Sequence, residues 1–410
     1  MPEFLTLLPP GEALQRLIDR LKLDPQVEKI ATEEACGRIS FCPVLAPQPL
    51  PEFARSTVDG YAVQARDTFG AGDSLPSYLR LVGEVAMGQA PEISLLPGTC
   101  ALIHTGGMLP ENADAVVMLE HTQVVGGDEI EIYRPVAVGE NVLVVGEDVA
   151  RGEEVIPAGK RLRPAEIGGL MALGITHIQV ARRPKVGILS TGDEVIPPHL
   201  QTAPGQVRDI NSYSLGALAA EHGGEPIRYG IIPDRYDFML EVARRALDEC
   251  DLLLITAGSS ASARDLTAQV IQELGEPGVI VHGVSVRPGK PTILGACQGK
   301  AVIGLPGNPV SALVIATIFV VPILRGLLGL PASSSTIWMR AKLTLNLASQ
   351  PGREDWVPVR LIEHHSGLLA EPIFGKSNLI FTLVRADGLA RVPADANGLN
   401  AGSVVEVMAL

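Results

Sequence analysis

The spacing of hydrophobic residues changes along the 410-residue chain and divides it into regions of different predicted structure. Residues 11–22 place four apolar side chains on one face of a helix. Residues 163–174 predict a second short helix, with a proline near its first turn and a glycine after its end. Between them, short β runs are broken by glycine and proline. The pattern predicts a β-rich domain, residues 46–145, inserted into a helical frame domain of residues 1–45 and 146–180.

From residue 185 onward, strand-like apolar runs alternate with segments of helical spacing. The predicted strands are KVGILST, PIRYGII and LLLITAG, and the predicted helices are NSYSLGALAAEHG, DRYDFMLEVARRALDEC and DLTAQVIQELG. We expect these helices to begin at Asn211 or Ser212, at Asp234 and at Asp265, where a side-chain oxygen can cap free amides. Repeated strand–helix–strand units predict a mainly parallel sheet with helices on both faces, a three-layer α/β/α domain of residues 181–328.

After about residue 329 the helical spacing disappears, and alternating apolar and polar residues predict only strands. We expect residues 329–410 to form a small β-barrel. The predicted fold class is therefore a multidomain α/β protein, with a central three-layer domain, an inserted β-rich domain, a helical frame domain and a C-terminal barrel.

One long uncharged run, residues 309–324, raises the possibility of a membrane segment. The run is about one helical turn shorter than the ~20 residues that a membrane span needs, and Pro322 interrupts it. We expect a helix buried in a soluble domain.

Charge and cysteine content narrow the class of protein. The net charge of −13 argues against nucleic acid or an anionic membrane as the main partner, since both favour a basic surface. The five cysteines are scattered and form no C-x-x-C pair, which favours a reducing compartment over a disulfide framework or a zinc site. No basic-then-apolar leader opens the chain. We expect a cytoplasmic protein.

Acidic residues follow the predicted parallel strands. Glu194, Asp234 and Asp265 come after the first, second and third strand of the α/β region. Each alone is explained by capping of the next helix. Because the ends of parallel strands meet at one edge of a sheet, however, the three carboxylates are expected to converge, and a cation would relieve their repulsion. Oxygen ligands favour Mg²⁺ over zinc.

The same edge carries residues suited to binding an anion. They occur in three segments, GSSAS (Gly258, Ser259 and Ser260), RPGKP (Arg287, Lys290 and Pro291) and LPGNP (Pro306, Gly307 and Asn308). A glycine turn or a helix N-terminus can present free amides to a phosphate, and the cations add charge. A surface lysine or a stiff turn would explain each segment singly, but together they predict a site for a Mg²⁺-bound phosphate ester.

Further polar residues stand in turns outside the α/β region. Asp59 lies in STVDGYAV, and Thr105 follows His104 in IHTGG. We interpret His104 itself as a structural histidine with satisfied hydrogen bonds. In the last domain, Arg353 lies in PGRED, and Ser377 lies in FGKSNLI beside a lysine.

These segments, in this order, resemble the molybdopterin molybdenumtransferase family, which includes MoeA and the E domain of gephyrin. The resemblance rests on STVDGYAV, HTGGMLPENADAVVMLEHT, GEDVARGE, STGDEV, RPGKPTILG, LPGNPVSALV, GKSNLI and RADGL, and it covers nearly the whole chain. It implies a homodimer of four-domain subunits. It also implies a Mg²⁺-dependent reaction in which adenylylated molybdopterin and molybdate give molybdenum cofactor and AMP.

The resemblance also implies roles for individual residues. The functional acidic and hydroxyl positions of the family match Asp59, Thr105, Asp148, Glu194, Asp234 and Asp265. Its molybdate-binding cluster matches Arg287, Lys290, Pro291, Arg353 and Ser377. In family dimers the loop that carries Asp59 and Thr105 reaches the cleft of the other subunit. One departure concerns residues 256–261, which read TAGSSA where the family usually has TSGGVS. The loss of a glycine restricts the backbone angles and narrows the approach to a phosphate, and serine can compensate with amide and hydroxyl donors.

The hypothesis is thus a Mg²⁺-dependent molybdenumtransferase, a homodimer with its active site at the subunit interface and transient contact with a molybdopterin adenylyltransferase. One alternative is a CinA-like nucleotide pyrophosphatase or deamidase, which shares the STGDEV motif but has it at the start of the chain. The other alternative is a non-catalytic scaffold related to gephyrin.

Overall fold

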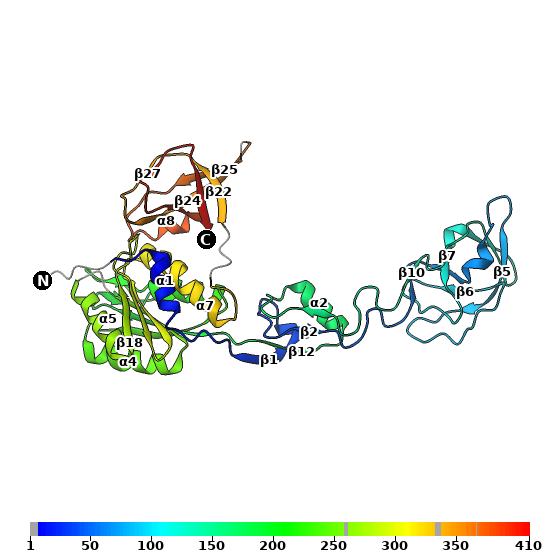
Figure 1. Cartoon of the computed structure of the whole chain (residues 1–410), viewed down its shortest axis with the longest axis horizontal. Helices are drawn as coiled ribbons and strands as arrows, with labels where there is room; N and C mark the ends of the chain where they lie inside the picture. Colours follow the sequence, from blue (N-terminus) through cyan, green and yellow to red (C-terminus); the bar gives the residue numbers. More distant parts are fainter. Residues whose placement is uncertain (1–6, 258–260, 333–337, 366) are drawn as a thin grey trace. The chain divides into compact units, whose positions relative to one another are not determined.

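The computed structural model describes residues 7–257, 261–332, 338–365 and 367–410, so the predicted loop residues Gly258, Ser259 and Ser260 lie outside the described residues. The chain forms two compact units (Figure 1). Unit 1 comprises Met1–Lys29, Gly37–Phe41 and Gln179–Leu410, and unit 2 comprises Ile30–Cys36 and Cys42–Ile178. The chain passes from one unit to the other within β1 (Val27–Ala31), at each end of Gly37–Phe41, and within β12 (His177–Ala181).

Unit 1 is built on a six-stranded sheet. Its strands, in spatial order, are β16 (Glu225–Ile232), β13 (Lys185–Thr191), β17 (Leu252–Ala257), β21 (Lys300–Pro306), β20 (Ile293–Cys297) and β18 (Pro277–His282). The first four are parallel, and β20 and β18 are added antiparallel. The sheet is therefore mainly parallel, as predicted.

Helices cover both faces of this sheet, because successive strand residues point to opposite sides. Ile188 of β13 belongs to one hydrophobic core, and the next residue, Leu189, belongs to the other. The first core is closed by α3 (Asn211–Glu221), α6 (Pro309–Ile315), α7 (Val321–Leu327) and α1 (Pro10–Ile18). The second is closed by α4 (Tyr236–Glu249) and α5 (Ala261–Glu273). The predicted three-layer α/β/α domain is confirmed.

Helix α1 packs on the α/β domain, although the sequence pattern placed it in the frame domain with residues 146–180. Ala13 and Leu17 are fully buried in the first core, together with residues of β13 and α7. The helical spacing showed that one face of α1 is apolar, but it did not show which partner covers that face.

Two of the three expected helix starts in the α/β domain are wrong, and the third is capped by another residue. Helix α3 is capped by Asp209, whose Oδ1 accepts the Ser212 N–H at 3.1 Å and whose Oδ2 accepts the Ser212 hydroxyl at 2.6 Å. Helix α4 begins after Asp234, at Tyr236. Helix α5 begins at Ala261, so Asp265 lies inside it. Capping of the next helix was the purely structural explanation for Asp234 and for Asp265. Neither residue caps its helix, so that explanation does not apply.

The apolar run after residue 308 forms a helix from Pro309 to Leu327, in which α6 and α7 flank the π-helical segment Ala316–Val320. By length and composition this helix could cross a membrane, yet 67% of its most apolar stretch is buried inside the structure. Phe319 at its centre is fully buried in the first core. Burial against the sheet accounts for its hydrophobicity.

The C-terminal region forms a closed five-stranded barrel, as predicted. Its strands, in order around the barrel, are β24 (Glu354–His364), β25 (Gly367–Pro372), β22 (Trp338–Leu343), β28 (Val404–Ala409) and β26 (Gly388–Val392), which pairs back to β24. The short elements beside it are β23 (Leu347–Ala348), β27 (Gly398–Leu399) and α8 (Phe381–Val384), a helix where the pattern predicted a strand. Strand β19 (Val286–Arg287) of the α/β domain pairs with β24.

Unit 2 contains the β-rich insertion. Its six-stranded sheet has the order β7 (Ala115–Met118), β4 (Gly60–Val63), β6 (Thr99–Ile103), β5 (Ser77–Glu84), β9 (Glu129–Ile132) and β8 (Thr122–Gly126). Its other elements are the strand pairs β3 (Arg55–Ser56) with β10 (Val142–Leu143) and β2 (Val44–Leu45) with β11 (Glu154–Ile156), and helix α2 (Pro164–Ala172). The two-residue strands β14 (Val195–Ile196) and β15 (Val207–Arg208) pair with each other in unit 1.

The burial of α1 gives a stability prediction. Leu17→Ala removes a fully buried side chain, so we expect it to lower the free energy of unfolding of unit 1 by about 2–5 kcal/mol. Glu12→Ala on the same helix is the control, since its surface pair with Arg16 contributes about 0.5 kcal/mol or less. Guanidinium denaturation measures both. Equal midpoints for Leu17→Ala and the wild type would show that α1 does not stabilise the α/β domain.

Candidate functional site

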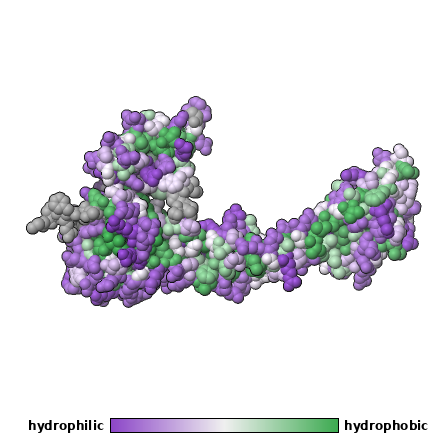
Figure 2. All heavy atoms as spheres, in the orientation of Figure 1, coloured by the Kyte–Doolittle hydropathy of each residue, from purple (hydrophilic) through white to green (hydrophobic). Residues whose placement is uncertain are grey.

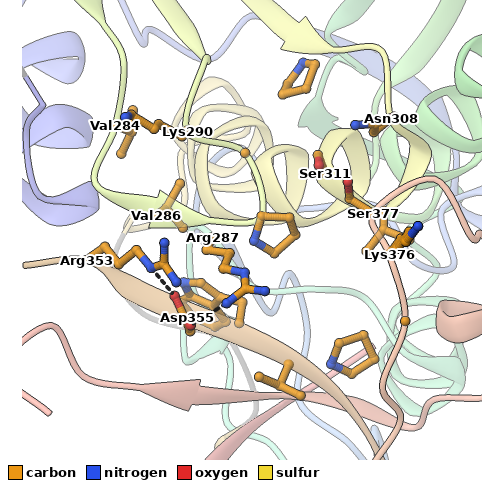
Figure 3. Close-up of a pocket in the computed structure, with 18 of the residues that line it drawn as sticks. Val284, Val286, Arg287, Lys290, Asn308, Ser311, Arg353, Asp355, Lys376 and Ser377 are labelled. Atoms are coloured by element: carbon orange, nitrogen blue, oxygen red, sulfur yellow. Dashed lines mark hydrogen bonds and ion pairs between the residues drawn. The ribbon is translucent and has the colours of Figure 1, made fainter. Parts of the chain in front are cut away.

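A cavity of about 960 Å³ lies in unit 1, between loops of the α/β domain and the barrel (Figure 3). Residues 284–291, between β18 and β20, form one wall, and residues 306–311, at the start of α6, form another. The barrel contributes residues 351–358, around the start of β24, and residues 373–378, after β25. The pairing of β19 with β24 brings these segments together.

Four cationic side chains line this cavity: those of Arg287, Lys290, Arg353 and Lys376. Three of them, Arg287, Lys290 and Arg353, match the molybdate-binding cluster of the family in the sequence analysis, as do Ser377 and Pro291, which line the same space. Asp355 is the only acidic side chain among the described residues that line it. The cavity therefore has a positive excess although the chain carries a net charge of −13. Such a cavity attracts an anion.

The RPGKP loop takes its shape from Gly289. This residue has a φ of +116°, and a Cβ there would lie 2.3 Å from Cγ1 of Ile315 in α6. Only glycine permits both this backbone angle and the close approach to the helix. The tight turn holds Arg287 and Lys290 on either side of it against the cavity.

The LPGNP turn is only partly available to an anion. Pro306 and Asn308 line the cavity, whereas Gly307 uses its carbonyl to accept a hydrogen bond of 2.8 Å from Nδ2 of Asn211. The N–H of Val310, in the first turn of α6, donates to the carbonyl of Ser377 at 3.1 Å. The expectation of freely open amides is therefore wrong for Val310, whose N–H ties the Ser377 turn of the barrel to the helix.

The carboxylates after the parallel strands are brought only partly together. Asp193 accepts the N–H of Asp234 at 3.3 Å, and burial raises the pKa of Asp234, with the charges of Asp193 and Glu194 adding to the shift. Glu194 and Asp234 are thus neighbours. Asp265 is exposed on α5, and no described contact links it to them. None of these carboxylates is among the described residues that line the cavity.

Within the described parts of the chain, no three histidine, cysteine or acidic side chains are arranged to hold a metal ion. The predicted three-carboxylate magnesium site is therefore not assembled by these side chains alone. Asp234 nevertheless has a buried Oδ1 that accepts no hydrogen bond from any described residue. Mg²⁺ in proteins often uses one or two carboxylates together with phosphate oxygens of a substrate. Asp234 and Glu194 fit that arrangement.

The sheet order shows how these groups relate to the cavity. Thr191 at the end of β13 is level with Ile232 at the end of β16, and Ala257 at the end of β17 is level with Pro306 at the end of β21. The carboxylates after β13 and β16 and the turn after β21 therefore lie along one edge of the sheet. Strand β17 stands between them and leads directly into residues 258–260.

A separate polar cluster lies in unit 2. Antiparallel pairing of Gly60 in β4 with Ile103 in β6 places Asp59 next to Thr105. The carboxylate of Asp59 accepts the backbone N–H of Thr105 at 2.8 Å and its hydroxyl at 3.2 Å. The backbone hydrogen bond is the largest cause that lowers the pKa of Asp59. The sequence analysis singled out both residues, and the structure joins them.

His104 lies between two carboxylates in this cluster. Its Nε2 is 3.1 Å from Glu84, which sequence reasoning missed, and its Nδ1 is 3.6 Å from Asp59. Only Nε2 lies within hydrogen-bond distance of its carboxylate, so the interpretation of His104 as a structural histidine stays a prediction. Asp148 is exposed elsewhere in unit 2, where its backbone N–H donates to the carbonyl of Leu50.

Comparisons with known proteins agree along the whole chain. Residues 8–174 match the MoeA N-terminal region (domains I and II), residues 187–326 match a probable molybdopterin-binding domain, and residues 340–410 match the MoeA C-terminal region (domain IV). The molybdopterin molybdenumtransferase of a Nostoc species is 31% identical, over 96% of this chain and 91% of its own length. The chain belongs to the molybdopterin molybdenumtransferase family.

Two further proteins extend the similarity. A putative molybdopterin biosynthesis protein of Methanocaldococcus jannaschii is 36% identical, over 97% of this chain and 95% of its own length. The crystal structure of a molybdopterin biosynthesis MoeA protein from Pyrococcus horikoshii superposes with a TM-score of 0.86 and 38% identity, covering 98% of this chain and 99% of that one. Family membership makes this chain an enzyme with a role in molybdenum cofactor biosynthesis.

In this molybdenumtransferase, sequence reasoning missed Asp355, a buried carboxylate that lines the cationic cavity. Asp355 lies two residues after Arg353 in the PGRED segment, and the two side chains form an ion pair. A carboxylate this close in sequence to a candidate arginine is the signal that could have identified it.

The environment of Asp234 gives a pH prediction. Because its pKa in the folded state is raised above the ordinary value of 3.8, its ionised form destabilises the fold at neutral pH. We expect Asp234→Asn to raise the thermal midpoint at pH 7, and the gain to disappear as the pH is lowered through the range of this pKa towards 3.8. Thermal unfolding followed by circular dichroism between pH 3.5 and about 8 measures the effect.

Asp237→Asn is the matched control for this experiment. Asp237 lies in the first turn of α4, where a negative charge is favourable, so its removal should not raise the midpoint. A lower thermal midpoint for Asp234→Asn at pH 7 would contradict the conclusion that burial and neighbouring negative charges make the ionised form of Asp234 destabilising.

Proposed function

We propose that this enzyme inserts molybdate into adenylylated molybdopterin and releases AMP in a Mg²⁺-dependent reaction. The observation that carries the proposal is the cavity between the α/β domain and the barrel, where four cations oppose one buried carboxylate. The role of the family in molybdenum cofactor biosynthesis fits this chemistry, because the oxyanion and the phosphates of the substrate are all anionic.

Molybdate is proposed to bind among Arg287, Lys290 and Arg353, with the turn at Ser377 closing the site. Guanidinium and ammonium groups form charge-assisted hydrogen bonds to oxyanions, and these are stronger than neutral ones. Arg287 and Arg353 each offer several N–H groups in a fixed plane, whereas Lys290 offers a compact charge. The combination suits a small tetrahedral dianion.

The diphosphate of the substrate is proposed to lie along the loop that begins at Gly258. This placement is supported by the strand order, since β17 ends between the carboxylates that follow β13 and the turn that follows β21. The backbone of Pro306–Asn308 and the following helix would then face the same anion from the cavity side.

Asp234 and Glu194 are proposed to hold Mg²⁺, with Asp265 on α5 as a further carboxylate at this end of the domain. The buried Oδ1 of Asp234 has no hydrogen-bond partner among the described residues, and the pKa of this carboxylate is raised. A bound cation would coordinate the oxygen and stabilise the ionised carboxylate. When bound, Mg²⁺ would neutralise charge that develops on the departing AMP. The residues of the chain themselves orient the phosphates and the oxyanion.

Turnover is tested directly with adenylylated molybdopterin, molybdate and Mg²⁺, with AMP measured by chromatography. We expect AMP release that requires molybdate and stops with a chelator. Bound substrate without molybdate-dependent AMP release would reject the proposal. Turnover of ADP-ribose or nicotinamide mononucleotide would instead favour the CinA-like alternative, and recovery of a peptide partner by an inactive protein would favour a scaffold.

Lys290→Ala provides a sharper prediction. The lost ammonium contributed a charged hydrogen bond of about 1.5–3 kcal/mol, so we expect kcat/KM for molybdate to fall by roughly 10- to 100-fold. Lys342→Ala on β22 of the barrel, outside the described lining of the cavity, is the control. An unchanged kcat/KM for molybdate in Lys290→Ala would show that this lysine does not bind molybdate.

The enzyme is further proposed to act as a cytoplasmic homodimer, in contact with a molybdopterin adenylyltransferase that supplies its substrate. The Asp59–Thr105 cluster supports a composite site: it is a preformed polar group in unit 2, outside the cationic cavity of unit 1. In the dimer, the cluster of one subunit would complete the cavity of the other.

Subunit mixing tests the composite site. We expect Asp59→Asn and Lys290→Ala to be weakly active alone, and their equimolar mixture to regain about a quarter of wild-type activity, because half of the dimers form one intact site. The mixture is prepared by subunit exchange, and AMP release is measured. If each site lies within one subunit, every site in the mixture keeps a defect and no activity returns.

A further inference from the structure

Asp355 has an unusual environment for an acidic residue. Its side chain is only 5% exposed and lies inside a cavity whose other charged groups are all cationic among the described residues (Figure 3). Its Oδ1 accepts a hydrogen bond of 2.9 Å from Nε of Arg353, and its Oδ2 is 3.7 Å from Nη1 of Arg287. One buried carboxylate therefore contacts two of the proposed molybdate ligands.

The fold fixes this contact from two directions. Arg287 and Asp355 are direct partners in the parallel pairing of β19 with β24, so they stand side by side across the junction of the two domains. Arg353 lies in the turn just before β24, two residues ahead of Asp355, and its Nε reaches back to the Asp355 carboxylate. The carboxylate thus joins an arginine of the α/β domain to an arginine of the barrel.

Charge alone does not explain a carboxylate at this position. A negative charge beside an anion site weakens attraction for the anion, and the effect is strong in a buried environment. Geometry provides the explanation. Each guanidinium has five N–H donors, so an arginine that uses one edge for Asp355 still has others for an oxyanion. The side chain of Arg287 is 61% exposed even with this contact, and Asp355 is its ion-pair partner among the described residues, so an Arg287 that lacked the contact would be free to turn towards solvent.

We infer that Asp355 is a positioning residue of the oxyanion site: it holds the guanidinium groups of Arg287 and Arg353 so that their remaining N–H groups face one bound tetrahedral oxyanion. This role deepens the proposed function and rests on it. Asp355 is not proposed to touch the substrate.

Two substitutions separate positioning from charge. Asp355→Asn and Asp355→Ala remove the same negative charge, but the amide oxygen of asparagine can still accept the Arg353 Nε hydrogen bond. Positioning therefore predicts that asparagine is the milder change, and a pure charge effect predicts equal, tighter binding in both. Glu406→Gln is the matched control, because Glu406 pairs with Arg391 on the same barrel and is not among the described cavity residues.

Binding of sodium molybdate alone to the full-length variants is measured by isothermal titration calorimetry. We expect the Kd of Asp355→Ala to rise about 10- to 100-fold, as for groups that orient the ligands of a metal. The Kd of Asp355→Asn should rise less, and that of Glu406→Gln should not change. In turnover, the KM for molybdate should rise in Asp355→Asn while kcat at saturating molybdate stays within about threefold.

Unchanged or tighter molybdate binding in both Asp355 variants, with a folded protein by circular dichroism, would overturn the inference. If Asp355→Ala does not fold, Asp355→Asn decides: a Kd raised by about threefold or more supports positioning, and a smaller or opposite change rejects it. A wild-type protein that binds no molybdate would reject the proposed function and this inference together. If the wild type binds molybdate and the Asp355 variants bind it with the same Kd, the inference about Asp355 is rejected and the proposed function is not.

Discussion

The pairing of β19 with β24 is the interaction on which the rest of the candidate site depends. It is a parallel contact of only two residues on the α/β side, Val286 and Arg287, with Glu354 and Asp355 of the barrel. The pairing sets the RPGKP loop of the α/β domain beside the PGRED turn of the barrel, while barrel residues such as Trp356 and Leu389 pack into the first core of the α/β domain. With this pairing, cations that are more than sixty positions apart in the sequence line one cavity. The tie between Val310 and Ser377 adds a second junction at the opposite wall.

The charge of the candidate site differs from the net charge of the chain. The chain is acidic overall, yet the cavity between the α/β domain and the barrel is cationic, with Asp355 engaged by two arginines. The carboxylates Asp193, Glu194 and Asp234 gather a short way along the same edge of the sheet, where burial, together with the charges of Asp193 and Glu194, raises the pKa of Asp234. An edge with a cationic end and an acidic end suits a substrate that carries an oxyanion at one place and a cation-bound phosphate at another.

Several parts of this picture follow from sequence periodicity. Alternation of strand and helix from residue 185 predicts the parallel sheet and its two helical layers, because each element must bury its apolar face. Alternation of period two after residue 329 predicts the barrel. The predicted helix starts failed where the preference of aspartate for a helix N-cap competed with tertiary packing. Asp234 and Asp265 look like helix caps, but α4 and α5 begin elsewhere, and α3 is capped by Asp209. The apolar face of α1 was evident, but its partner was not, because periodicity shows that a face is buried and never against what.

The sequence by itself determined the family, the kinds of element, three of the four cationic side chains of the cavity and the acidic residues at the strand ends, since these depend on residue type and on spacing along the chain. Only the tertiary structure decided which of them meet. It joined Arg287 to Arg353 through Asp355, set Glu194 beside Asp234, and used the Val310 N–H to fasten a turn. These contacts depend on strand register and on packing between distant segments, and neither is encoded in the local pattern of any single segment.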